Sequence, residues 1–572
     1  MKHIYFITTK SDNNKFKKIL KLFIITLILI PLFGSCDYLD YNELDQYEKK
    51  DIFIEYSRVK AVLTSAYTYL PDDFLSIDGA MRSSASDDAV HEWDLSDIHK
   101  FNDGSWNSIV TLDDNWQHFY SGIRVANVFL KEGTGLTFDD IKYNDNYSEL
   151  MRQYEYYPYE ARFLRAFYYF ELAKRYKNVP LIIEPLSSET VNSLSPTSFD
   201  NLINFIVTEC DDVSAHLLST YEGFSGAETG RATKGAALAL KARALLYAAS
   251  PLHNTTGDVN KWIDAAKASK AIIDEFASTY SPLPSYANAV NQLNSKETIF
   301  ERRPASQVRT FEEANTAVGF IGGNTGTCPT QNLVDSYEMQ ANGLGINEEG
   351  SGYDPANPYE GRDPRLAATV LYNGSTWKTL PVEVWNGGLN GPPKPHTTKT
   401  GYYLKKYLKE NISLDPVNPG TDYHYWIIFR YAEVLLNYAE AMNEAYGPEV
   451  TGTAPLDNMT ALDAVNIVRA RASMPDFPTG MTKDAFRTKL RNERRVELAF
   501  EDHRFWDIRR WKIGNQTKEI YGVNVTKNEL DEYTYTRKLV ETRFWNDRMY
   551  LYPIPSTEYF INNNLGQNPG WE

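Results

Sequence analysis

The segment from Pro158 to Leu181 constrains the fold most, because it has a helical pattern with two apolar sides. One stripe at helical spacing consists of Phe163, Ala166, Phe167, Phe170 and Ala173. A second stripe consists of Ala161, Leu164, Tyr168 and Leu172. A helix that is apolar on two sides must pack against two neighbours. The sequence therefore predicts a body of several helices with this segment inside it, ending near Asn178-Val179-Pro180.

Further amphipathic segments follow along the chain. An alanine-rich helix is predicted over 234–250, before Pro251, and others over 262–276, 431–445 and 461–472. Their small residues at contact positions allow close packing and resemble tetratricopeptide-like helix pairs, although a strict repeat of about 34 residues is absent. We expect an all-α fold of stacked helix pairs, which bury one face and present another.

Irregular stretches interrupt the helices. The longest, residues 278–422, is rich in Gly, Pro, Asn and aromatic residues, and another lies near 83–106. We expect an amino-terminal helical part over 36–277, a loop-rich insert over 278–422 and a carboxy-terminal helical part over 423–572. So long a non-helical stretch in a compact protein is usually functional, and ligand binding is expected there.

The amino terminus has the layout of a secretory signal. A basic stretch precedes an apolar run from Leu22 to Phe33, which is too short to span a bilayer comfortably as a helix. Gly34-Ser35 then lead directly to Cys36. This arrangement resembles a lipoprotein signal, in which residues 1–35 are removed and Cys36 is acylated. We expect residues 36–572 to be tethered to a membrane by this lipid.

Charge and ligand-type side chains exclude several classes of function. The net charge of −16 has the wrong sign for a nucleic-acid binder. The three cysteines and nine histidines show no CxxC, HExxH or comparable spacing, so we expect no metal site and no cofactor. Cys210 lies in an apparent helix and is interpreted as a small buried hydrophobe. A disulfide between Cys210 and Cys328 stays open.

The densest charged motif, residues 491–511, alternates acidic and basic side chains. Glu493, Glu497 and Glu501 could be interpreted as general acids or bases. Arginines surround these glutamates, and guanidinium groups lower the pKa of a carboxyl group, which suits ion pairs. We interpret the motif as structural. The acidic pair Asp87-Asp88 is interpreted as a solvated face or a helix cap.

Aromatic side chains in polar loops are the candidate ligand contacts. Sugar recognition pairs an aromatic face, which packs on ring C–H groups, with planar polar side chains that bond to hydroxyls. Rings outside the helical stripes have no predicted core to explain them. The predicted ligand-binding residues are Trp93, Phe101, Asn102, Trp377 and Trp385. No catalytic residue is predicted.

Seven strings spread over the chain together resemble one family. They are CDYLD from Cys36, EARFLRAFYYFELAKRYKNVPLI, GRATKGAALALKARALLYAASP, RYAEVLLNYAEAMNEA, NIVRARA, LRNERRVELAFEDHRFWDIRRWK and YLYPIPSTEYFINNNLGQNPGW. They occur in the family's order over essentially the whole mature chain. On these strings the chain is similar to SusD/RagB outer-membrane lipoproteins of the Bacteroidetes type.

The resemblance implies an all-α, SusD-like fold of four tetratricopeptide-like helix pairs that carry a loop-rich ligand-binding portion. It also implies surface exposure on the outer membrane and a SusC-like TonB-dependent transporter as partner, over whose barrel such proteins sit like a lid. Most members bind glycans, so we expect non-catalytic capture of oligosaccharide or polysaccharide and its delivery to the transporter. Two alternatives stay open: a peptide-binding member of the family, and a surface glycoside hydrolase.

Overall fold

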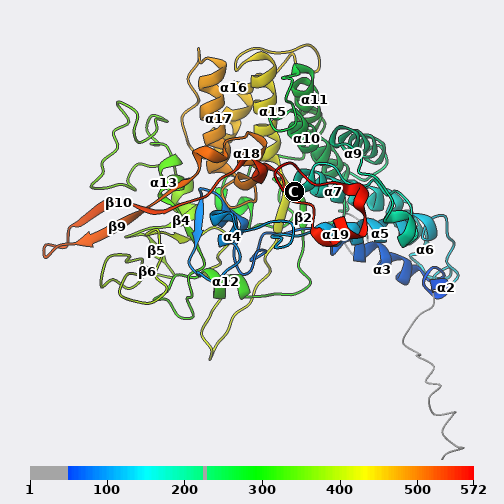
Figure 1. Ribbon diagram of the computed structural model, residues 1–572, viewed down its shortest axis with the longest axis horizontal. Coiled ribbons are helices and arrows are strands. Elements are labelled where there is room, and N and C mark those ends of the chain that lie inside the picture. Colours follow the sequence, from blue (N-terminus) through cyan, green and yellow to red (C-terminus); the bar gives the residue numbers. More distant parts are fainter. Residues whose placement is uncertain (1–48, 223, 225–227, 572) are drawn as a thin grey trace, which may run out of the picture.

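The computed structural model describes residues 49–222, 224 and 228–571. The predicted signal and Cys36 lie outside the described residues. The protein is built mainly from α-helices, as predicted, and its sheets are all two-stranded within the described part of the chain. Figure 1 shows the helices on one side of the molecule and the irregular segments, with one long hairpin, on the other.

A continuous stack of helices forms the scaffold. Each helix from α3 to α15 in this stack contacts the next, and α16 and α17 both pack on α15. The stack consists of α3 (Tyr56–Tyr67), α5 (Trp116–Glu132), α7 (Tyr157–Tyr176), α9 (Phe199–Ser214), α10 (Lys234–Ala249), α11 (Val259–Glu275), α15 (Tyr431–Tyr446), α16 (Ala461–Arg471) and α17 (Lys483–Glu497).

The helix with two apolar sides, α7, lies inside the stack as predicted. All but three of its 20 residues are buried, and it packs between α5 and α9. The helix α10 begins where Thr233 accepts a hydrogen bond from the backbone of Ala236, a typical N-cap. Gly235 then allows close packing, since a Cβ there would lie 2.4 Å from the hydroxyl oxygen of Tyr280.

Short elements occupy the rest of the chain. The short α-helices are α2 (Lys49–Ile52), α4 (His99–Asp103), α6 (Tyr147–Tyr154), α8 (Ser188–Val191), α12 (Thr310–Asn315), α13 (Gln331–Ser336), α14 (Arg365–Thr369), α18 (Arg504–Arg510) and α19 (Ser556–Ile561). Short 3-10 helices cover Arg82–Ala85, Tyr286–Ala289, Gly514–Gln516, Asp547–Tyr550 and Asn563–Leu565.

Four small antiparallel strand pairs tie the loops together. They are β1 (Ala89–His91) with β3 (Thr327–Pro329), β2 (Thr298–Arg302) with β8 (Trp426–Arg430), β4 (Val370–Leu371) with β7 (Tyr403–Leu404), and β5 (Thr376–Trp377) with β6 (Leu380–Pro381). The pair β1–β3 joins the amino-terminal loop near residues 83–106 to the loop-rich insert.

A long hairpin, which the sequence analysis did not predict, projects from the carboxy-terminal part (Figure 1). It consists of β9 (Glu519–Lys527) and β10 (Tyr533–Thr542) in antiparallel register. The middle of β9 is held by a hydrogen bond of 2.7 Å from the backbone N–H of Val523 to the carbonyl of Thr400. The ring of Tyr535 also packs edge-on against Tyr359, with 5.5 Å between ring centroids. The hairpin therefore supports the loop that precedes β7.

Candidate functional site

The candidate ligand surface is built around Trp93, directly after β1. The backbone N–H of Glu92 donates to the carbonyl of Gly326 and extends the β1–β3 pairing. The indole N–H of Trp93 donates to the carbonyl of Thr325 at 2.9 Å. Its ring stacks on the imidazole of His396, with 4.0 Å between centroids and 22° between planes. Trp93 is half-buried and His396 is exposed, so the pair forms a held aromatic surface at the edge of the loops.

Charged groups surround this pair. The ammonium of Lys399 bonds to the carbonyl of His91 at 3.2 Å and pairs with Asp94. Burial raises the pKa of Glu92 to about 7, although Lys399 opposes the shift. One carboxylate oxygen of Glu92 is buried without a hydrogen-bond partner in the described part of the chain. The loop therefore holds a carboxyl group that titrates near neutral pH beside Trp93.

Trp385 belongs to the segment that also carries His396. Its ring is half-buried, and the ammonium of Lys527 on β9 lies 4.8 Å from the ring centroid. Gly387, at φ +101°, lies so close that a Cβ there would come within 3.2 Å of the ring. The segment from Trp385 to Thr400 thus contributes two rings to the candidate ligand surface, the indole of Trp385 and the imidazole that packs on Trp93.

The other three predicted ligand residues are placed differently, and the expectation that they lie on an open loop surface is corrected. Trp377 is 1% exposed, Phe101 3% and Asn102 7%. Phe101 packs on Trp106, with 4.8 Å between ring centroids, and the amide of Asn102 donates to the carbonyl of Ser84 at 3.1 Å. Phe101 and Asn102 lie on α4 and Trp377 lies on β5, and all three side chains are buried in the protein.

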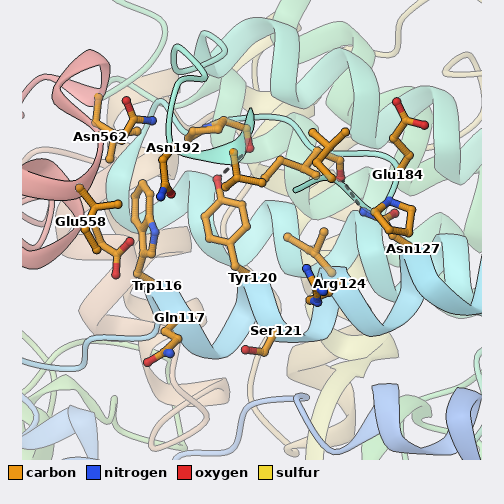
Figure 2. Close-up of a pocket in the computed structure, with 18 residues that line it drawn as sticks. Trp116, Gln117, Tyr120, Ser121, Arg124, Asn127, Glu184, Asn192, Glu558 and Asn562 are labelled. Carbon is orange, nitrogen blue, oxygen red and sulfur yellow. Dashed lines mark hydrogen bonds between the residues drawn. The ribbon is translucent and has the colours of Figure 1, made fainter. Parts of the chain in front are cut away.

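A pocket of about 370 Å³ lies along α5 and was missed by the sequence analysis (Figure 2). Three segments line it: α5, the chain over 180–192 that follows α7, and the chain over 558–565 from α19 onwards. Trp116 and Tyr120 form part of its wall, and Glu558 lies at the end near Trp116 (Figure 2). No local pattern could have predicted it, because the three segments are far apart in sequence.

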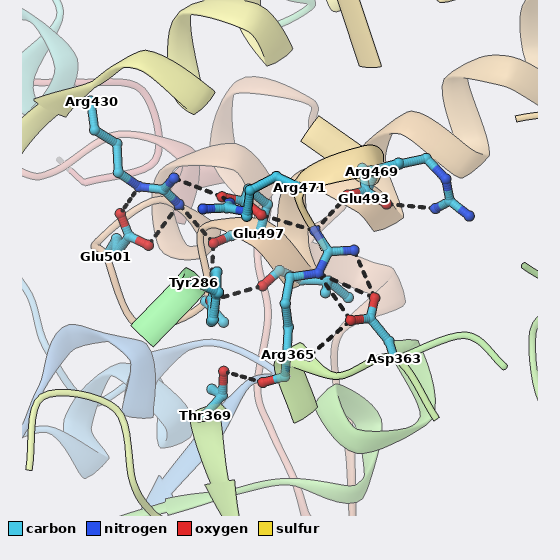
Figure 3. Close-up of polar contacts among 12 residues, drawn as sticks. Tyr286, Asp363, Arg365, Thr369, Arg430, Arg469, Arg471, Glu493, Glu497 and Glu501 are labelled. Atoms are coloured by element: carbon cyan, nitrogen blue, oxygen red, sulfur yellow. Dashed lines mark hydrogen bonds and ion pairs between the residues drawn. The ribbon is translucent and has the colours of Figure 1, made fainter. Parts of the chain in front are cut away.

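The glutamates of the charged motif lie in a buried ion-pair network (Figure 3). Arg365 contacts Glu493 at 2.5 Å and Glu497 at 2.9 Å, and Arg430 contacts Glu501 at 2.6 Å. Burial raises the pKa of each glutamate, but the guanidinium groups lower it more, so all three pKa values lie below the ordinary range. Carboxylates held ionised in this way are structural and are poor general acids.

The interpretation of Asp87-Asp88 as a solvated face or a cap is wrong. Both side chains are buried, Arg495 contacts Asp88 at 2.6 Å, and Arg504 contacts Asp87 at 2.8 Å. Asp88 directly precedes β1. The carboxy-terminal charged motif therefore anchors the loop that carries Trp93.

The part of the chain over residues 49–222, 224 and 228–571 contains no group of three or more His, Cys, Asp or Glu side chains placed to hold a metal ion. It also contains no helix that is long and apolar enough to cross a membrane. Cys210 and Cys328 are buried and free, so they do not form a disulfide.

Two family models match the chain. One, described as the SusD family, matches residues 294–571. The other, described as starch-binding and associating with the outer membrane, matches residues 37–246. Together they include the loop around Trp93, most of the helical stack and the charged motif.

Individual relatives agree with the family models. SusD-like protein P2 of Formosa agariphila is 25% identical over 95% of this chain and 98% of its own length. A SusD-like protein of Bacteroides fragilis has a solved structure that covers 91% of this chain and 98% of its own, with 28% identity and a TM-score of 0.75. A SusD-like carbohydrate-binding protein of the same organism gives 28% identity, coverage of 90% and 100%, and a TM-score of 0.71.

Proposed function

The chain belongs to the SusD/RagB family, and from that premise we propose that it binds oligosaccharide at the bacterial outer-membrane surface without catalysing a reaction. The observation that carries the proposal is the Trp93–His396 stack, a held aromatic surface in a polar loop. The solved relative that is described as a carbohydrate-binding protein shares the fold over 90% of this chain.

The proposed mechanism uses a surface that is already formed. Trp93 is fixed by its hydrogen bond to Thr325 and by His396, so little conformational entropy is lost when a ligand packs on it. Apolar C–H groups of a sugar would pack on the exposed part of the rings. Lys399 and the exposed carboxylate of Asp94, which form an ion pair beside these residues in sequence, would bond to sugar hydroxyls.

Trp385 is a second proposed contact. Its half-buried ring lies on the same segment as His396, with the cation of Lys527 over its face. A longer oligosaccharide would bridge from the Trp93 pair to this ring. We do not extend the proposal to Trp377, Phe101 or Asn102, because their side chains are buried in the core.

We propose further that acylated Cys36 anchors the protein and that it delivers its ligand to a SusC-like TonB-dependent transporter. The description of the family model over residues 37–246, which includes association with the outer membrane, supports the location. A lipid anchor suits this role, because it holds the ligand-binding body close to a transporter without crossing the membrane.

Native affinity gels test the binding function. The full-length protein, solubilised in detergent, would be run through gels that contain soluble starch, a β-glucan, a xylan, an arabinan or a mannan. Retardation in at least one of these gels is expected, with normal migration in a gel that contains only polyacrylamide. Unretarded migration in every gel, by protein that melts cooperatively, would contradict the proposal.

A further inference from the structure

The pocket along α5 shares no lining residue with the loops around Trp93, so it is a separate feature of the helical scaffold. Its volume of about 370 Å³ is within the range of small-molecule sites. Trp116 and Asn127, which both line it, are eleven residues apart on α5. Since a helix rises about 1.5 Å per residue, the pocket extends roughly 16 Å along the helix, which is long enough for two sugar units.

Trp116 offers this pocket a hydrogen-bond donor. Its side chain is 5% exposed, and Tyr176 packs edge-on against the ring with 5.0 Å between centroids. Within the part of the chain that the structure describes, the indole N–H of Trp116 makes no hydrogen bond. Figure 2 shows this nitrogen on the side of the ring that faces Tyr120. The N–H can therefore donate to an acceptor that enters the pocket.

Glu558 offers an acceptor at the same end. Asp114 accepts a hydrogen bond from the backbone N–H of Trp116, and the Asp114 carboxylate is one cause of the raised pKa of Glu558, after burial. Glu558 therefore lies near the start of α5, as Figure 2 also shows. Its half-buried carboxyl group pairs with no cation in the described residues.

Hydroxyl groups suit both side chains, because a hydroxyl can accept from the indole N–H and can donate to the carboxylate. An ammonium group has no acceptor and would leave the indole N–H unpaired. Elsewhere in the pocket, Leu186 and Val191 form an apolar wall, while the exposed side-chain amide of Asn192 makes no hydrogen bond within the described chain. Apolar and planar polar groups together suit the two kinds of surface on a sugar.

We propose that the α5 pocket is a second carbohydrate site, which takes one or two sugar units whose hydroxyl groups bond to Trp116 and to Glu558. The site does not depend on the function proposed for the Trp93 surface. It would let the protein hold a glycan on its helical scaffold as well as on its loops.

Fluorine NMR of the full-length protein in detergent, labelled with 5-fluorotryptophan, tests the site. Trp116→Phe and Trp93→Phe assign the two resonances, so one spectrum reports on both surfaces separately. The probes are maltose, cellobiose and lactose at millimolar concentration, with ethylammonium chloride as the comparison that has donors and no acceptor. At least one disaccharide should shift the Trp116 resonance in a saturable way, and ethylammonium should not.

Glu558→Ala should then lower the affinity for that disaccharide by about tenfold or more, since the substitution removes a hydrogen bond to a charged group. Thr557→Ala is the matched control, because Thr557 is exposed on α19 and does not line the pocket. The proposal is overturned if no disaccharide moves the Trp116 resonance, if ethylammonium moves it equally, or if the two variants bind alike. A shift of the Trp93 resonance alone would support the loop surface and overturn the α5 site.

Discussion

At the scale of single residues, burial decides which aromatic rings a ligand can reach. Trp93, Trp377 and Trp385 all occur in similar Gly- and Asn-rich stretches of sequence. Trp377 is nevertheless buried in β5, whereas Trp93 and Trp385 keep part of their rings open. The difference comes from contacts between segments far apart in the chain, which local composition does not contain.

The charged motif was easier to interpret, because alternating acids and arginines indicate ion pairs wherever the partners come from.

One prediction at this scale concerns the centre of the ion-pair network. Glu497→Ala removes a fully buried carboxylate that Arg430, Arg365 and Arg471 share. Unpaired buried charges should lower the free energy of unfolding by roughly 3–5 kcal/mol. Thermal denaturation measures the effect. Asp139→Ala, which breaks an exposed ion pair with Lys142, is the control and should cost less than about 1 kcal/mol. Equal melting temperatures for the two variants would show that the network is not structural.

A second prediction concerns pH. Burial raises the pKa of Glu440, but Arg510, together with Arg494 and Arg491, outweighs burial and lowers the pKa to about 2 from an ordinary value of 4.5. A carboxyl group with a depressed pKa in the folded state stabilises the protein above about pH 4.5, and this contribution is lost as pH falls towards 2. The melting temperature of Glu440→Gln should therefore lie well below that of the wild type at pH 6, and the gap should shrink below pH 4.5. A gap that stays constant down to pH 2.5 would contradict this account.

At the scale of elements, helices were predictable and the hairpin was not. The helices α7 and α10 carry long stretches of helical periodicity, and they form where the pattern predicts them. Buried and exposed residues alternate only in part along β9 and β10. The strand β9 buries residues on both of its faces, while much of β10 is exposed. Their pairing is fixed by contacts with the loops, and a pattern of period two is weak evidence without that partner.

The junction of the hairpin with the insert gives a prediction at this scale. A Cβ on Gly522 would lie 2.5 Å from the carbonyl oxygen of Thr400, so Gly522→Ala must displace the backbone that follows His396. Such overpacking typically costs about 1–3 kcal/mol, and it should also weaken glycan binding at Trp93. Asn524→Ala, at an exposed position of the same strand, should change neither the free energy of unfolding nor glycan binding. Thermal denaturation and calorimetric titration measure both effects, and wild-type behaviour of Gly522→Ala would contradict this close contact.

At the scale of the whole molecule, the family and the helical class were predictable because their signals are distributed. Seven strings and several periodic helices agree with one another, and an error in one does not change the conclusion. The ligand surface depends on a few loop side chains, which can be replaced without altering the helices. The α5 pocket was missed for a related reason, since it arises only when 116–127, 180–192 and 558–565 meet.

The membrane anchor is a prediction about the whole chain. Cys36→Ala should abolish incorporation of radiolabelled palmitate and move the protein from the membrane fraction to a soluble one, because stable attachment requires the acyl chains. Cys210→Ala is the control, since this thiol is buried in α9, and it should leave labelling unchanged. Membrane partitioning of Cys36→Ala equal to that of the wild type would rule out this anchor.

The central claim is that the loop surface around Trp93 binds glycan, and calorimetric titration of Trp93→Ala tests it most directly. The ligand is an oligosaccharide of the polysaccharide that retards the wild type most strongly. Losing a stacked ring removes about 0.5–1.5 kcal/mol beyond its buried area, so the affinity should fall by about tenfold or more. Tyr143→Ala, which removes a ring that is 88% exposed elsewhere, should bind like the wild type. If folded Trp93→Ala also binds like the wild type, the glycan site does not lie at this surface.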